Sequence, residues 1–172
     1  MSENNSKITS SSYLEKLTQK LLSYKPLIII IIFCLILPFC HQGSENFMYR
    51  FMGYFFIFLS MFKFFDLKGF VDGFSSYDLM AKHFKTYGYI YPFIEFFLGI
   101  SYLLEIWPVL VNYLTLIIMI ISGIGVIKSI FSGQKIKCAC LGTVLNVPLS
   151  TVSILENFGM GAMAAYKLNY LF

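Results

Sequence analysis

The strongest constraint on this chain is a series of apolar stretches separated by short polar connections. A membrane-spanning helix needs about 20 largely apolar residues, and lengths near this value favour helices over strands. The stretches that we interpret as spans cover residues 24–41, 47–65, 89–107, 109–127 and, less clearly, 148–172. Only 13% of the residues are charged and 58% are hydrophobic, which is too little charge to cover a soluble domain of this length. The sequence therefore predicts an all-α integral membrane protein, built as a five-span helical bundle.

The remaining segments are polar connections and a tail. Residues 1–23 form a polar, partly amphipathic N-terminal tail, and residues 133–148 form a loop that contains two cysteines. Residues 66–88 mix charge, glycine and aromatics, and this composition favours an amphipathic segment at the membrane interface. The net charge of +4 is small and gives no nucleic-acid signal, so the expected partner is the lipid bilayer.

The basic residues indicate an orientation. If the N-terminus is cytoplasmic, 11 of them lie on the inner side and 2 on the outer side. The inner set is Lys7, Lys16, Lys20, Lys25, Lys63, Lys68, Lys82, Lys85, Lys128, Lys135 and Lys137, and the outer set is Arg50 and Lys167. By the positive-inside rule we expect a multi-pass protein of the bacterial inner membrane, with a cytoplasmic N-terminus and a periplasmic C-terminus.

The stretch "KIKCACLG" contains the clearest chemical motif. Cys138 and Cys140, hereafter the CxC pair, would point to nearly opposite faces of a helix, so their thiols can converge only in a non-helical turn. Two such thiolates can chelate a soft metal ion or cycle through a strained disulfide. Lys135 and Lys137 favour the thiolate form. The alternative is that both are incidental small residues of a loop.

The first span carries the other two cysteines. Cys34 lies within the apolar run, where cysteine is common as a small hydrophobe. Cys40 and His41 lie together at the predicted membrane edge, and thiolate and imidazole are both soft-metal ligands. The candidate metal ligands are therefore Cys138, Cys140, Cys40 and His41, with no cofactor certain.

Charged and polar side chains in spans are costly, and they are usually paired or functional. Lys63 and Glu95 lie toward the same predicted end of their spans, so we expect an ion pair between them. Glu156 and Asn157 follow the CxC loop and are expected to form either a polar site near that loop or a helix–helix hydrogen bond.

The order of these motifs resembles the MauE/DoxX family of redox-associated membrane proteins, named for the methylamine utilisation protein. Members have a lysine that closes a first core helix, a Pro-x-x-Glu start to the second, and a Cys-Gly-Cys-Phe-Gly-like motif before the fourth. The residues that match over roughly 47–168 are Lys63, Pro92, Glu95, Cys138, Cys140 and Gly142. Here the cysteine motif reads Cys-Ala-Cys-Leu-Gly. The resemblance implies a four-helix core over residues 47–172, preceded by one extra N-terminal transmembrane helix over 24–41.

Three functions remain open at this stage. The resemblance implies thiol–disulfide exchange in the maturation of exported redox proteins, with a thioredoxin-like partner and Cys40 as a second exchange site. The predicted topology instead places the CxC pair in the reducing cytosol, which disfavours stable disulfides. That layout resembles bacterial mercuric transporters, and it implies soft-metal transfer from Cys40 to the CxC pair with a metal-carrier partner. The third function is a structural membrane subunit. The sequence does not decide whether the protein is an enzyme.

Overall fold

A computed structural model describes residues 28–40, 46–132 and 153–171, and within these ranges every element is a helix. The all-α prediction is thus confirmed for the described residues. The elements are a first helix (Ile28–Cys40), α2 (Phe47–Phe65), α3 (Leu67–Tyr77), α4 (Leu79–His83), α5 (Lys85–Leu103), α6 (Pro108–Phe131), a π-helical turn η2 (Leu155–Gly159) and α8 (Met160–Leu171). The N-terminal tail and the CxC loop lie outside the described residues.

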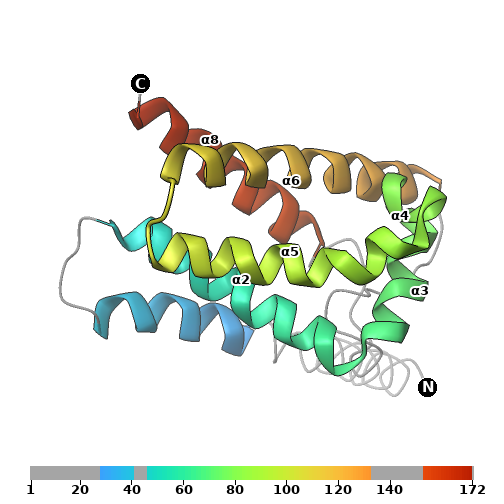
Figure 1. The fold of residues 1–172 in the computed structure, drawn as a ribbon, viewed down its shortest axis with the longest axis horizontal. Coiled ribbons are helices and arrows are strands. Elements are labelled where there is room, and N and C mark those ends of the chain that lie inside the picture. The colour runs from blue at the N-terminus through green and yellow to red at the C-terminus, as the bar shows by residue number, and fades with distance from the viewer. Residues whose placement is uncertain (1–27, 41–45, 133–152, 172) are drawn as a thin grey trace, which may run out of the picture.

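Two helix pairs form the body of the bundle. Helix α2 packs mainly against α5, and α6 packs mainly against η2 and α8, while Ile28–Cys40 runs along the outside of α2 (Figure 1). The α2–α5 crossing depends on two glycines, because a Cβ on Gly53 would lie 2.9 Å from the Gly99 carbonyl oxygen and a Cβ on Gly99 equally close to that of Gly53. Small residues let two backbones approach in this way in membrane bundles.

Helices α3 and α4 close one end of the bundle. Each begins at an aspartate that accepts backbone N–H groups: Asp66 from Gly69 at 3.0 Å, and Asp78 from Met80 and Ala81 at 2.9 Å. The predicted interfacial segment 66–88 therefore consists of two short helices and the first turn of α5. Its position at a membrane surface stays a prediction.

Two of the helices begin and end at other residues than the predicted spans. Helix α5 covers 85–103 instead of 89–107, because Glu105 and Trp107 adopt left-handed backbone angles, with φ of 53° and 46°, that end one helix before Pro108 starts the next. Helix α6 continues to Phe131, four residues beyond the predicted end, and Lys128 lies in its last turn. Lysine at a helix C-terminus is compatible with the helix dipole.

The structure supports membrane insertion most directly at α6. Among the described helices, α6 alone is both long and apolar enough to cross a membrane by length and composition, and Ile28–Cys40 is apolar but shorter. The outward-facing side chains of α6 are large and apolar, for example Ile117 and Ile120, each 52% exposed. The arrangement of four core spans and one extra span stays a prediction.

Candidate functional site

The middle of the bundle contains three charged side chains from three different elements, hereafter the ion cluster: Lys63 of α2, Glu95 of α5 and Glu156 of η2. The Lys63 Nζ donates to both carboxylate oxygens of Glu95 at 2.5 Å and to Glu156 Oε1 at 2.8 Å. The three residues are at most 2% exposed. The expected Lys63–Glu95 pair is confirmed, and Glu156 is an additional partner of the same ammonium group.

Two aromatic rings also lie close to the ammonium group. The Lys63 Nζ lies 5.0 Å from the centre of the Tyr91 ring and 5.4 Å from that of Phe70. Both distances allow a cation–π attraction, which is strongest where water is excluded. The cluster therefore joins α2, α3, α5 and η2 at one point. Its contacts are those expected of a group that holds helices in position.

The π-helical turn η2 places two consecutive polar side chains in the interior. Glu156 reaches Lys63, while Asn157 faces α6, where a Cβ on Gly123 would lie 3.6 Å from the Asn157 Cβ. Turns of this kind occur mostly as single-turn bulges in α-helices, and frequently at functional sites. Sequence reasoning selected both residues but did not predict the turn, for which the pattern of residues 153–160 carries no recognisable signal.

A small polar cavity lies next to the ion cluster. Its volume is about 10 Å³, and its lining includes Ser122, Glu156 and Asn157. This volume is close to the minimum that holds one water molecule. The Asn157 Oδ1 is buried and makes no hydrogen bond to any part of the chain that the structure describes.

A second polar network, which sequence reasoning missed, lies near the end of the bundle where α5 connects to α6. The Tyr102 hydroxyl donates to Asn112 Oδ1 at 3.0 Å and lies 3.0 Å from Thr115 Oγ1. The Asn112 amide in turn donates to the Tyr49 hydroxyl at 3.2 Å and to the Pro108 carbonyl at 2.8 Å. Because these groups satisfy one another, the network is best explained as a structural link between α2, α5 and α6.

The structure places only two of the four cysteines. Cys34 is fully buried, and Cys40 is exposed at the end of its helix. Ser132, the last described residue before the CxC loop, ends α6 at the opposite end of the bundle from Cys40 (Figure 1). The CxC pair and His41 lie outside the described residues, and over 28–40, 46–132 and 153–171 no three His, Cys, Asp or Glu side chains form a metal-binding group.

Comparison with protein families gives one match. The model of the methylamine utilisation protein MauE matches residues 44–169, which is most of the chain. The chain belongs to the MauE family. The matched MauE region contains the ion cluster, Asn157 and both cysteines of the CxC pair, whereas the first helix precedes it. No curated protein and no solved structure matches the chain. As a MauE protein, the chain is a membrane protein.

Proposed function

We propose that this MauE protein performs thiol–disulfide exchange that supports the maturation of redox proteins, in the context of methylamine utilisation that the family name describes. The support is the family match, whose range, residues 44–169, includes the CxC pair. The ion cluster gives further support, because Lys63 binds Glu156, which follows the CxC loop in the sequence. This contact anchors the chain after the loop to the bundle.

The exchange requires a partner protein that carries a disulfide or a dithiol, such as a thioredoxin-like protein. One thiolate of the CxC pair attacks a sulfur of the partner's disulfide and forms a mixed disulfide, and the other sulfur of the partner leaves as a thiolate. The second cysteine of the pair then attacks the mixed disulfide. The CxC pair ends as a disulfide and the partner as a dithiol, so that two electrons pass to the partner and its sulfurs take up two protons.

Trapping the intermediate tests this proposal. With Cys140→Ser the resolving thiol is absent, so a mixed disulfide with the partner should accumulate on Cys138 and disappear on treatment with a reductant. Cys34→Ala is the matched control, because Cys34 is fully buried and should not exchange. Absence of any mixed disulfide with either single CxC variant, in cells that contain the partner, would contradict the redox function.

One observation favours a soft-metal transporter as a second candidate. The exposed Cys40 and the end of α6 that leads into the CxC loop lie at opposite ends of the bundle, as expected for capture on one side and acceptance on the other. In proteoliposomes, uptake of Cu(I) or Hg(II) that is lost with Cys40→Ser would select the transporter. Metal binding alone would not, since thiolates bind these ions in either case.

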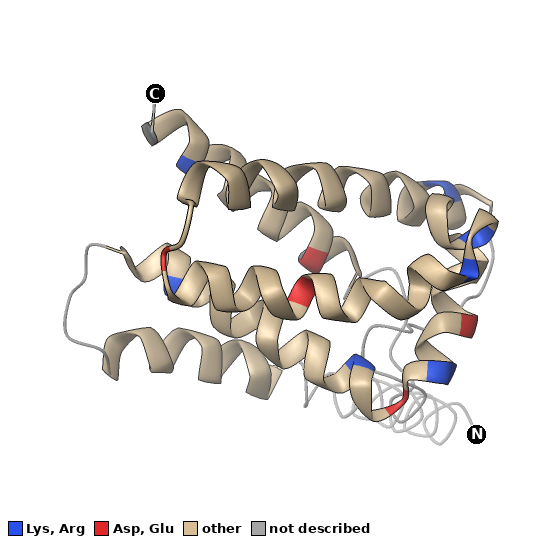
Figure 2. Cartoon of the chain, viewed as in Figure 1, with Lys and Arg blue, Asp and Glu red and all other residues tan. Residues whose placement is uncertain are grey.

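The orientation is part of the proposal. Basic residues concentrate at the end of the bundle formed by α3 and α4 (Figure 2). By the positive-inside rule this end faces the cytoplasm of a bacterial cell. We therefore place the chain in the inner membrane as a multi-pass protein with a cytoplasmic N-terminus.

A further inference from the structure

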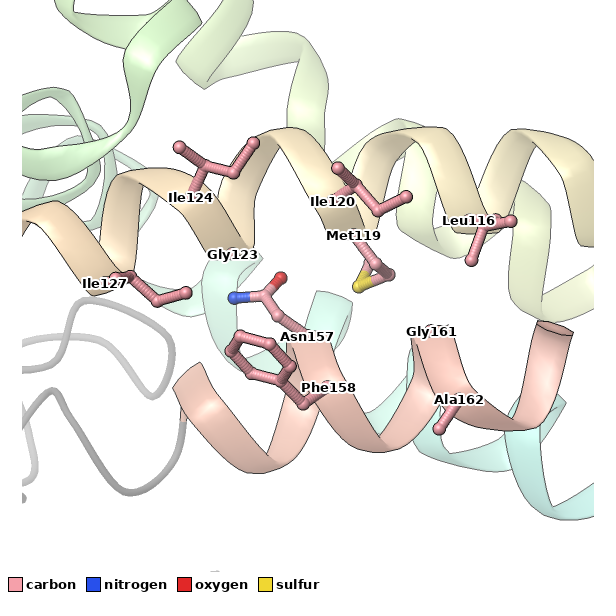
Figure 3. Close-up of a pocket in the computed structure, with 10 residues that line it drawn as sticks. All are labelled: Leu116, Met119, Ile120, Gly123, Ile124, Ile127, Asn157, Phe158, Gly161 and Ala162. Carbon is pink, nitrogen blue, oxygen red and sulfur yellow. The ribbon is translucent and has the colours of Figure 1, made fainter.

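An apolar groove lies between α6 and the last helix, and neither the ion cluster nor the CxC pair uses it. We call it the α6–α8 groove; its volume is about 370 Å³, at the lower end of the range for ligand pockets. Ile120 and Ile124 of α6 and Phe158 of η2 line it, and Met119 and Asn157 extend into the space between the two helices (Figure 3).

The groove opens toward the region where lipid is expected. It lies along the middle of α6, the described helix that is long and apolar enough to cross a membrane. Ile120, Ile124 and Phe158 are each about half exposed, so the groove is open on that side. An occupant would therefore enter from the hydrocarbon region, and it must be largely apolar to remain there.

Asn157 gives the groove a hydrogen-bonding point. It is the only residue with a polar side chain among the described residues that line the groove, it is 5% exposed, and its Oδ1 has no hydrogen-bond partner in the described chain. Buried amides are normally satisfied, so an orphaned one indicates a missing partner. An amide accepts from a hydroxyl and donates to a carbonyl, so it suits a head group that carries either.

The surroundings of Asn157 select the charge and shape of that head group. No charged side chain is among the described residues that line the groove. A carboxylate or phosphate head group would therefore be buried there without a partner of opposite charge, which is costly. The Phe158 ring and the Met119 thioether provide faces that favour a flat ring.

We propose that the α6–α8 groove binds a neutral, lipid-soluble ring compound whose carbonyl or hydroxyl groups bond to Asn157 and whose apolar tail leaves toward the bilayer. This binding does not depend on the proposed thiol chemistry.

Photo-crosslinking in lipid nanodiscs tests the proposal. The probe is a photoactivatable phenol with a decyl tail and a fully substituted ring, so that its hydroxyl can donate to the Asn157 Oδ1 and thiols do not add to it, and the protein is the full chain. Crosslinks should map to the groove-lining parts of α6 and the last helix, and an excess of the unlabelled phenol should displace them while oleate should not. The same result is expected with Cys138→Ser, which separates failure of this proposal from failure of the redox function.

Two variants and a control make the result specific. Asn157→Leu removes one hydrogen bond and should weaken competable labelling about tenfold. Ala162→Phe should block it, because Ala162 lines the groove and is exposed, so the larger ring enters the groove without disturbing the core. Ile117→Phe is the matched control on exposed α6 outside the groove and should leave labelling unchanged. Labelling that the competitor fails to displace, that oleate displaces equally, or that Ala162→Phe leaves intact would overturn the proposal and mean that ordinary lipid chains fill the groove.

Discussion

Replacing Lys63 tests whether the ion cluster holds the bundle together. Lys63→Met removes the ammonium group that lies 2.5 Å from Glu95, which is 0% exposed. Removing one partner of a buried ion pair costs about 3–5 kcal/mol, because the remaining charge stays buried without compensation. For a chain of this size, each kcal/mol shifts the melting temperature by about 2–4 °C, so we expect a decrease of about 6–20 °C.

The assay is thermal unfolding of the purified protein in detergent, followed by the helical circular dichroism signal. Lys82→Met is the matched control, because Lys82 is an exposed lysine of α4 that receives the same substitution. A surface change of this kind usually alters the free energy of unfolding by at most about 0.5 kcal/mol.

The double variant decides whether the two residues act as partners. Lys63→Met combined with Glu95→Gln removes both charges, so its melting temperature should be higher than that of Lys63→Met alone. The reasoning is refuted if the double variant loses the sum of the decreases in melting temperature caused by Lys63→Met alone and Glu95→Gln alone. It is also refuted if Lys63→Met is no more destabilising than Lys82→Met.

Three further predictions concern packing, pH dependence and topology. Gly125→Val should lower the free energy of unfolding by about 1–3 kcal/mol in the same thermal assay, because a Cβ there would lie 2.7 Å from the Tyr77 carbonyl oxygen. Gly161→Ala should be tolerated, because the atom nearest to its Cβ would be 3.6 Å away. Burial raises the pKa of the Asp78 carboxyl above its ordinary 3.8, so the folded protein binds this proton more tightly than the unfolded chain. Wild type therefore gains stability as the pH falls through the raised pKa, whereas Asp78→Asn does not. The melting temperature of Asp78→Asn should exceed that of wild type at pH 7, and this difference should shrink toward pH 4; a constant difference would contradict the prediction. An impermeant maleimide applied to intact cells should label Cys40 but not the CxC pair, and labelling of the pair from outside would reverse the proposed orientation.

The sequence predicted the parts of the site that depend on depth in a span. Lys63 and Glu95 could be paired because each lies at a similar level of a regular helix, and α-helical geometry then brings both to the core. The third member of the ion cluster could not be predicted, because the direction of Glu156 depends on the π-helical turn and on how the last helix rotates against α6. The amphipathic character of residues 67–77 was expected, but not that Phe70, Val71 and Phe74 would be at most 2% exposed within the chain itself. Composition does not show that a short amphipathic helix turns its apolar face onto the end of a bundle.

The π-helical turn marks the place where this chain tolerates a change in length. Downstream of it, Met160, Ala164 and Leu168 repeat at helical spacing and are 1%, 0% and 8% exposed. A π-helical turn holds about one residue more than an α-helical turn, so deleting one residue within Leu155–Gly159 would give α-helical winding and leave those three side chains on the core face. Deleting one residue between Met160 and Lys167 would instead rotate the residues that follow by about 100° and move Lys167 from its place 4.6 Å from the centre of the Tyr49 ring. We therefore expect related chains to gain or lose a residue within the turn, and to keep the residue count from Met160 to Leu171 fixed.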